Sequence, residues 1–283
     1  TRPRPVPQPR GAPAAARAMT PSIGLVIVGD EILSGKREDK HLPKVIALLA
    51  ARGLALAWAR YVGDERERIT ATLRDAFAGG DLVFCTGGIG ATPDDHTRQA
   101  AAAALGRELV LHPEAKALIL ERMRDTAREQ GVPFEPERPD NLHRLNMGVF
   151  PAGAAIIPNP YNKIPGFSVG DVHFVPGFPV MAWPMIEAVL DQRYAHLHGG
   201  GRTHERSVIV MGSMEATLTP LMEAIEARFP GFKVFSLPSV DHPQWGRHIE
   251  LGVKGRGDPQ PAFEALKAGL APLGARLGPE MVR

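Results

Sequence analysis

The sequence has little net charge, one cysteine and no long apolar run. Its 33 basic and 31 acidic residues leave a formal charge of +2, and they are interspersed, so no cationic face for a nucleic-acid backbone is expected. The single cysteine, Cys85, excludes an intramolecular disulfide and is typical of a reducing compartment. No stretch approaches the roughly 18 apolar residues that a membrane span needs. We therefore expect a cytoplasmic protein that binds neither nucleic acid nor membrane.

The length and composition predict two domains. The chain has 283 residues, of which 44% are hydrophobic, enough for one large core and a smaller one. Residues 1–20 are rich in Pro, Ala and Arg and predict a disordered tail, because they bury too little apolar surface to offset chain entropy. We expect a first domain over residues 21–195, a polar, glycine-rich linker over 196–205, and a second domain over 206–283.

Apolar runs alternate with segments of helical period in the first domain. The runs "IGLVIV" (23–28) and "DLVFC" (81–85) are continuous, which is typical of strands covered on both faces. A strand near "ELVL" (108–111) continues the series, and a long helix is expected over about 113–130. This alternation predicts an α/β fold with a mostly parallel sheet between helices. Beyond the linker, successive strands between helices predict a small α+β domain.

A glycine-rich turn follows the third predicted strand. Gly87, Gly88 and Gly90 permit positive φ angles and close approach to a ligand. Thr92 and Pro93 then predict the N-cap and first residue of a helix. Because ligands bind at the carboxyl ends of strands in open α/β sheets, and helix N-termini attract anions, the turn predicts a cradle for phosphate.

Two acidic clusters accompany this turn. Asp94 and Asp95 would repel a phosphate unless a divalent cation such as Mg²⁺ lay between them; alternatively, the helix dipole alone favours acidic residues there. A second cluster after the first strand comprises Asp30, Glu31 and Asp39. If the two strands are neighbours, this cluster lies at the same edge of the sheet as the glycine turn. The alternative is a structural role, in which Asp30 only ends a strand and Asp39 is a solvated residue ahead of a helix. Similarly, Asp64 is predicted to cap the next helix.

Several motifs in the same order resemble one known family. They are "VGDEILSGKRED", "VGDERERI", "TGGIGATPDDHTRQAAAAALG", Asn159–Pro160, and "VPGFP" at 175–179. The stretch from about Ser22 to Gln192 is similar to the molybdopterin-binding domain of the CinA (competence/damage-inducible protein A) family. The resemblance implies the three-layer α/β/α sandwich shared with MoaB/MogA-like proteins. Residues after about 205 are more weakly similar to the small domain that follows in CinA-type chains.

The resemblance also implies roles for particular residues. Asp39 and Asp95 match the two aspartates of molybdopterin adenylyltransferases and are the candidate catalytic residues, while Asp94 and Asp95 are the candidate metal ligands. The candidate ligand- and phosphate-binding residues are Gly29, Asp30, Glu31, Gly35, Thr86, Gly87, Gly88, Gly90, Thr97, Pro176 and Gly177. Where the family commonly has Asp-Thr-Asn, this chain has Asp39-Lys40-His41, which makes Lys40 and His41 further candidates for contacting a phosphate.

Three functions remain open on the sequence. The first is a molybdopterin- or nucleotide-binding protein, with Mg²⁺ and molybdopterin as candidate cofactor and ligand, and with adenylyl transfer as a candidate activity. The second, which the resemblance to CinA-like domains implies, is a metal-dependent pyrophosphatase acting on ADP-ribose or related dinucleotides. The third is a non-enzymatic regulatory binding module. We expect the partner to be a small phosphate-bearing molecule and the protein to form a homo-oligomer.

Overall fold

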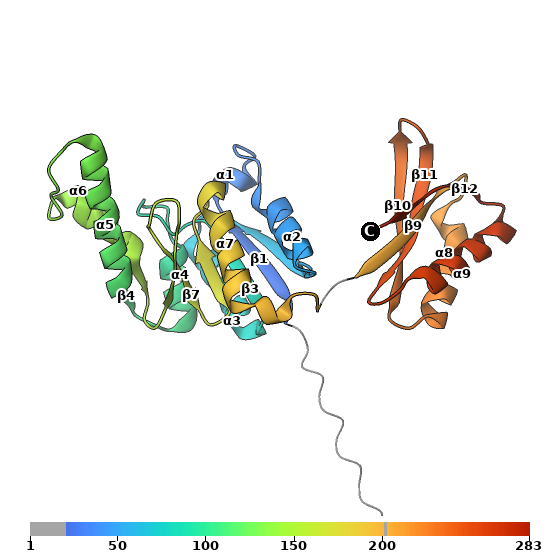
Figure 1. Cartoon of the computed structure of the whole chain (residues 1–283), viewed down its shortest axis with the longest axis horizontal. Coiled ribbons are helices and arrows are strands. Elements are labelled where there is room, and N and C mark those ends of the chain that lie inside the picture. Colours follow the sequence, from blue (N-terminus) through green and yellow to red (C-terminus); the bar gives the residue numbers. More distant parts are fainter. Residues whose placement is uncertain (1–20, 201–202) are drawn as a thin grey trace, which may run out of the picture.

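The computed structural model describes residues 21–200 and 203–283 (Figure 1). The predicted N-terminal tail and part of the predicted linker lie outside the described residues. Among the helices that the structure describes, none combines the length and apolar composition needed to cross a membrane.

A six-stranded sheet forms the centre of the larger unit, in the order β2-β1-β3-β8-β7-β6. Strands β2 (Trp58–Val62), β1 (Ile23–Val28), β3 (Leu82–Thr86) and β8 (Val172–Val175) are parallel to one another. Strand β7 (Gly166–Val169) runs antiparallel to both its neighbours, β8 and β6 (Ala155–Ile157). The predicted mostly parallel sheet is confirmed.

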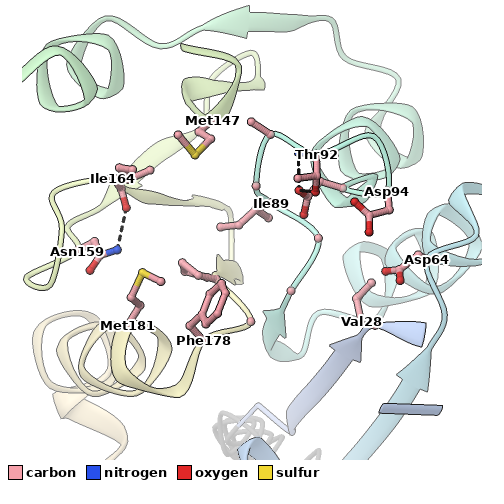
Figure 2. A pocket seen from close by; sticks show the side chains of 18 of the residues that line it. Val28, Asp64, Ile89, Thr92, Asp94, Met147, Asn159, Ile164, Phe178 and Met181 are labelled. Atoms are coloured by element: carbon pink, nitrogen blue, oxygen red, sulfur yellow. Dashed lines mark hydrogen bonds between the residues drawn. The ribbon is translucent and has the colours of Figure 1, made fainter. Parts of the chain in front are cut away.

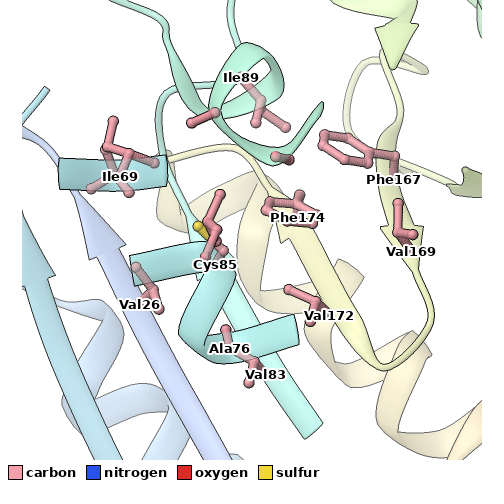
Figure 3. Close-up of a cluster of buried hydrophobic side chains, with 14 of the residues drawn as sticks. Val26, Ile69, Ala76, Val83, Cys85, Ile89, Phe167, Val169, Val172 and Phe174 are labelled. Atoms are coloured by element: carbon pink, nitrogen blue, oxygen red, sulfur yellow. The ribbon is translucent and has the colours of Figure 1, made fainter. Parts of the chain in front are cut away.

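Helices cover both faces of this sheet because alternate residues of each strand point to opposite sides. Leu25 and Ile27 of β1 pack with α2 (His41–Ala51) and α7 (Pro179–Arg193). Val26 and Val28 pack with α3 (Arg66–Gly79) and α4 (Thr97–Leu105) in the opposite layer (Figure 3). The three-layer α/β/α sandwich is therefore confirmed. Cys85 lies in the second of these clusters, where burial raises the pKa of its thiol to about 12 and makes it an apolar packing residue.

The remaining elements of this unit surround the sheet. Short helix α1 (Asp30–Leu33) follows β1, and α5 (Pro113–Gln130), α6 (Pro139–Arg144) and two 3₁₀ turns (Leu145–Gly148 and Ala195–Leu197) complete the helices. The long helix begins and ends where predicted. The "ELVL" segment forms β4 (Leu109–Leu111), which pairs with β5 (Val149–Pro151) in a separate two-stranded sheet rather than joining the main one.

The C-terminal part forms a separate antiparallel sheet in the order β10-β11-β9-β12. Its strands are β9 (His204–Met211), β10 (Phe232–His242), β11 (Gly246–Gly255) and β12 (Arg276–Val282). Helices α8 (Glu215–Arg228) and α9 (Gln260–Leu270), followed by a 3₁₀ turn (Ala271–Leu273), complete it. Leu218 and Phe263 of the helices pack on Val208 and Leu251 of the sheet. The predicted small α+β domain is confirmed, with β12 as an additional strand.

Candidate functional site

The turns after β1 and β3 lie at the same edge of the sheet. These strands are adjacent and parallel, with Ile27 in register with Thr86, so their carboxyl ends meet. Both turns line one cavity of about 500 Å³ (Figure 2). Of the predicted site residues, the lining includes Gly29, Glu31, Gly87, Gly88, Gly90, Asp94, Asp95, Pro176 and Gly177.

Thr97 holds the first half of the glycine turn. Its hydroxyl donates to the Gly87 carbonyl at 3.0 Å, and its backbone N–H donates to the Gly88 carbonyl at 2.9 Å. Thr97 is completely buried and does not line the cavity. The position of Thr97 also explains why residue 88 is a glycine. Gly88 has a φ of +67°, and a Cβ there would collide with the Thr97 hydroxyl. Thr97 thus holds the backbone of the turn from beneath the cavity lining.

Two further side chains hold the second half of the turn. The Arg98 guanidinium donates to the Gly90 carbonyl, and His143 Nε2 lies 2.7 Å from the Ala91 carbonyl. Because a carbonyl oxygen only accepts, the His143 nitrogen must carry the proton. Arg98 is 4% exposed, and burial lowers its pKa. A charged side chain is therefore committed to the backbone of this turn.

The glycine turn is polarised by these contacts. Its carbonyls at Gly87, Gly88, Gly90 and Ala91 are all tied back by donors. Within residues 21–200 and 203–283, no acceptor is bonded to the N–H groups of Gly88, Ile89 and Gly90. A turn with engaged carbonyls and free amides presents partial positive charge, which suits an anionic ligand.

The segment after the turn differs from the predicted helix start. Helix α4 begins at Thr97 with His96 as its N-cap, so Thr92 and Pro93 do not cap or open a helix. Instead, the Asp95 carboxylate accepts from both the N–H and the hydroxyl of Thr92, while the Asp95 N–H donates to the Thr92 carbonyl at 3.0 Å. This local side-chain bonding closes a tight turn in competition with the helix. It also occupies Oδ2 of the candidate catalytic Asp95.

The tetrapeptide Val-Gly-Asp-Glu occurs twice, and its valine is the last residue of β1 in one copy and of β2 in the other. The strands hold the two copies in register, with Val28 opposite Val62. The Asp30 N–H donates to Asp64 Oδ2 at 2.9 Å, and the Asp64 N–H donates to Asp30 Oδ1 at 3.1 Å. Asp64 therefore bonds the other turn rather than capping α3, whose N-cap is Glu65. Asp64 lines the cavity, whereas Asp30 supports it from outside the lining.

Negative charge is crowded at this side of the cavity. Burial raises the pKa of the Asp64 carboxyl, and the neighbouring charges of Asp30, Glu31 and Asp94 raise it further. Figure 2 shows Asp64 and Asp94 together on one side of the pocket. Among the described residues, however, no group of three or more His, Cys, Asp or Glu is arranged to hold a metal ion. A cation here would need oxygen atoms from a ligand as well.

Asp39 lies apart from this cavity. Its carboxylate accepts from the N–H groups of His41 (2.7 Å) and Leu42 (3.1 Å) and from the Tyr61 hydroxyl (2.8 Å). These bonds cap the N-terminus of α2, and Asp39 is absent from the cavity lining. The structure thus does not bring the two candidate catalytic aspartates together. Gly35 lies in the exposed turn after α1, and Thr86 lines a neighbouring cavity.

The opposite side of the cavity is an apolar wall. It consists of Ile89, Met147, Ile164, Phe178 and Met181, which gather around the pocket in Figure 2. This wall was missed by the sequence reasoning because its members come from four separate segments.

Asn159 organises part of this wall. Its amide nitrogen donates to the Ile164 carbonyl (3.0 Å) and to Asn162 Oδ1 (2.8 Å). Asn159, Asn162 and Arg37 join Asp64 as lining residues that were not predicted. Two sequence patterns could have identified some of these residues: the Asn-Pro motif marks Asn159, and the repeated Val-Gly-Asp-Glu marks Asp64.

A mostly parallel sheet between two helical layers, with its cavity at the carboxyl ends of the central strands, defines an α/β ligand-binding architecture. The family model described as "Probable molybdopterin binding domain" matches residues 24–196. The chain belongs to this family.

Individual relatives agree with that assignment. A CinA-like protein of Geobacter metallireducens is 31% identical over 270 residues, covering 91% of this chain and 60% of the relative. A protein of Pyrobaculum calidifontis is 30% identical over 260 residues, covering 89% of this chain and 94% of the relative. The crystal structure of the protein CinA with unknown function from Thermoplasma acidophilum is 27% identical, with a TM-score of 0.50, covering 60% of this chain and 96% of that one.

The resemblance to CinA-like proteins is thereby confirmed. The chain spans 60% of the length of the Geobacter relative and 52% of the CinA-like protein of Syntrophotalea carbinolica.

Proposed function

We propose that the protein binds a phosphate-bearing heteroaromatic molecule, of the molybdopterin or nucleotide type, in the cavity at the carboxyl ends of β1 and β3. The observation that carries this proposal is the polarity of the glycine turn: the carbonyls of Gly87, Gly88, Gly90 and Ala91 are engaged, whereas the amides of Gly88, Ile89 and Gly90 have no acceptor among the described residues. A phosphate group supplies the acceptors that these amides lack.

The shape of the turn supports close approach of such a group. Gly87 has a φ of +95°, and a Cβ at this position would strike the Val28 carbonyl. A Cβ at Gly90 would lie 2.5 Å from an Asp95 carboxylate oxygen. Glycine is therefore required at position 87 by the backbone, and at position 90 it leaves room for the Asp95 carboxylate, so that bare backbone faces the ligand.

The apolar wall indicates that the part of the ligand beyond its phosphate is a planar ring. Phe178 is 55% exposed, and it lies beside Met181 at the edge of the pocket. An aromatic or thioether surface open to a cavity suits stacking against a pterin or a nucleobase. Asn162, which also lines the pocket, offers a polar group for the ring edge.

The carboxylates that line the cavity favour a ligand that binds together with a divalent cation. Glu31, Asp64 and Asp94 line the same cavity as the glycine turn, and they would repel a phosphate without a compensating charge. Mg²⁺ bound between the phosphate and Asp94 would neutralise both and fix the phosphate against the amides. Asp95 holds the turn through Thr92, and Asp39 holds α2, so both act as positioning residues in this proposal.

Titration calorimetry with ADP-ribose and with molybdopterin, each with and without Mg²⁺, tests the proposal. We expect Mg²⁺ to tighten binding at least tenfold in the wild type, in line with a charge-assisted contact. Asp94→Asn should remove most of that gain. The control is Asp241→Asn, an exposed position of β10 in the small domain, which should retain it.

Other outcomes point to the other hypotheses. Hydrolysis of ADP-ribose during the titration, abolished by Asp94→Asn, would establish the pyrophosphatase in place of a binding protein. Absence of binding by either compound, with or without Mg²⁺, would contradict the proposal and leave the regulatory module.

A further inference from the structure

A second, smaller cavity lies beside the proposed ligand site. It has a volume of about 250 Å³ and is lined by residues of β1, β3, α1 and α2. Val28, Glu31, Arg37 and Gly177 line both cavities, so the two spaces share a wall. Most of its lining residues belong to the motifs quoted above, whereas Lys40 and His41 lie outside them.

Two buried polar atoms of this cavity lack partners. Thr86, the last residue of β3, is 1% exposed, and His41, the first residue of α2, is 4% exposed. In the described part of the chain, neither Thr86 Oγ1 nor His41 Nδ1 has a hydrogen-bond partner. Both residues line the smaller cavity. Buried polar groups are normally paired, so two unpaired ones at one cavity indicate a missing hydrogen-bonding group.

The hydrogen-bonding capacities of the two side chains indicate which kind of group would pair with them. His41 Nε2 lies 2.9 Å from the Gly177 carbonyl, which can only accept, so Nε2 carries the proton. In the neutral imidazole Nδ1 is then a lone-pair acceptor. Thr86 Oγ1 can both donate and accept. A hydroxyl matches this pair, because it donates to Nδ1 while accepting from Thr86.

We propose that His41 and Thr86 form a subsite for a hydroxyl group of the ligand, and that the ligand is consequently a phosphate ester of a sugar or polyol. This inference rests on the proposed function, since the phosphate is taken to occupy the glycine turn.

The experiment compares two phosphate esters of equal chain length. D-ribitol 5-phosphate carries hydroxyls along its five carbons, and pentyl phosphate carries none; inorganic phosphate reports on the glycine turn alone. We expect the wild type to bind the ribitol ester at least tenfold more tightly than the pentyl ester, because a polar subsite rejects an analogue that leaves it unpaired. Thr86→Val should reduce this ratio to near one, and the conservative Thr86→Ser should restore it.

A second readout separates binding from folding. Thr86→Val removes an unpaired buried hydroxyl at nearly constant volume, so the ligand-free variant should melt about 2 °C higher than the wild type. A variant that is more stable yet discriminates less well is the signature of a ligand subsite.

The possible failures are distinguishable. Equal binding of the two esters by the wild type, or a ratio that Thr86→Val leaves unchanged, would overturn the subsite and favour an ordered water in the cavity. Absence of binding by inorganic phosphate and by both esters would overturn the proposed function together with this inference.

Discussion

Two groups of buried polar side chains in the larger unit differ in how completely they are paired. In the first, Ser168 Oγ, His173, the Tyr194 hydroxyl and Asp171 form one continuous chain, with each contact 2.7 Å long. The Tyr194 hydroxyl donates to Asp171, so it accepts from His173 Nε2, and Nδ1 is left to accept from Ser168. The second group, His41 and Thr86, has one unpaired polar atom in each side chain.

This difference separates structural polar groups from groups available to a ligand. The paired chain joins β7 and β8 to Tyr194, the C-cap of α7, and each of its members has a partner. The unpaired atoms lie where strands end and a cavity begins. Since an unpaired buried polar atom destabilises the folded state, its persistence beside a cavity points to binding. Substitutions in the two groups should consequently change stability in opposite directions.

The largest expected effect is in the paired chain. His173 is completely buried and its ring lies 5.4 Å from that of Phe84. His173→Leu leaves the Ser168 hydroxyl without a partner and alters the packing, so we expect a loss of about 3 kcal/mol in the free energy of unfolding. Urea denaturation measures this loss. Thr86→Val is the matched variant in the unpaired group. If Thr86→Val and His173→Leu destabilised the protein to a similar extent, the proposed difference between the two groups would be wrong.

The pH dependence of stability sharpens the same contrast. Burial, and then the charge of Arg193, lower the pKa of His173 from 6.5 to about 3. Between these values the unfolded chain binds a proton that the folded chain does not, so stability falls as pH falls below about 6.5. From pH 7 to pH 5 this residue alone should account for a loss of about 2 kcal/mol.

Urea denaturation at the two pH values measures that contribution. His173→Leu should show a smaller decline than the wild type by the stated amount, because its residue does not titrate. Equal declines in the two proteins would mean that the pKa of His173 is the same in the folded and the unfolded state.

The smallest expected effect distinguishes the aspartates. Asp39→Ala removes the cap of α2 and the acceptor of Tyr61, so the free energy of unfolding should fall by about 1 to 2 kcal/mol. Asp94 is exposed, and Asp94→Asn should change stability by less than about 0.5 kcal/mol. Thermal unfolding of both variants provides the comparison. A catalytic Asp39, as the family resemblance implies, would instead show lost activity at unchanged stability.

Much of the fold could be predicted from the sequence because its signals are local. The apolar runs of β1 and β3 identified buried parallel strands, and the glycines identified the turn. Strand β7 was missed because "GFSV" is short and gains meaning only through its pairing with β8.

The site was less predictable because its contacts join distant segments. Thr92 matched a helix cap by type, yet the Asp95 side chain bonds to it first and delays α4 by four residues. Arg98 occurs in a helix where a charged residue is ordinarily exposed, and only the fold shows its burial against Gly90. The unpaired atom of His41 depends on Gly177, which lies 136 residues away in sequence.

The mutual bonds between Asp30 and Asp64 connect the ends of two strands, and one of the two residues, Asp64, also faces the cavity. Asp64 Oδ2 is the acceptor for the first amide of α1, so a proton or a cation taken up by that carboxylate competes with the amide for the same oxygen. Charge uptake in the pocket is thereby coupled to the start of α1 and to the position of Glu31 beside it. Occupancy of the site and order in the loop leading to α2 should rise and fall together.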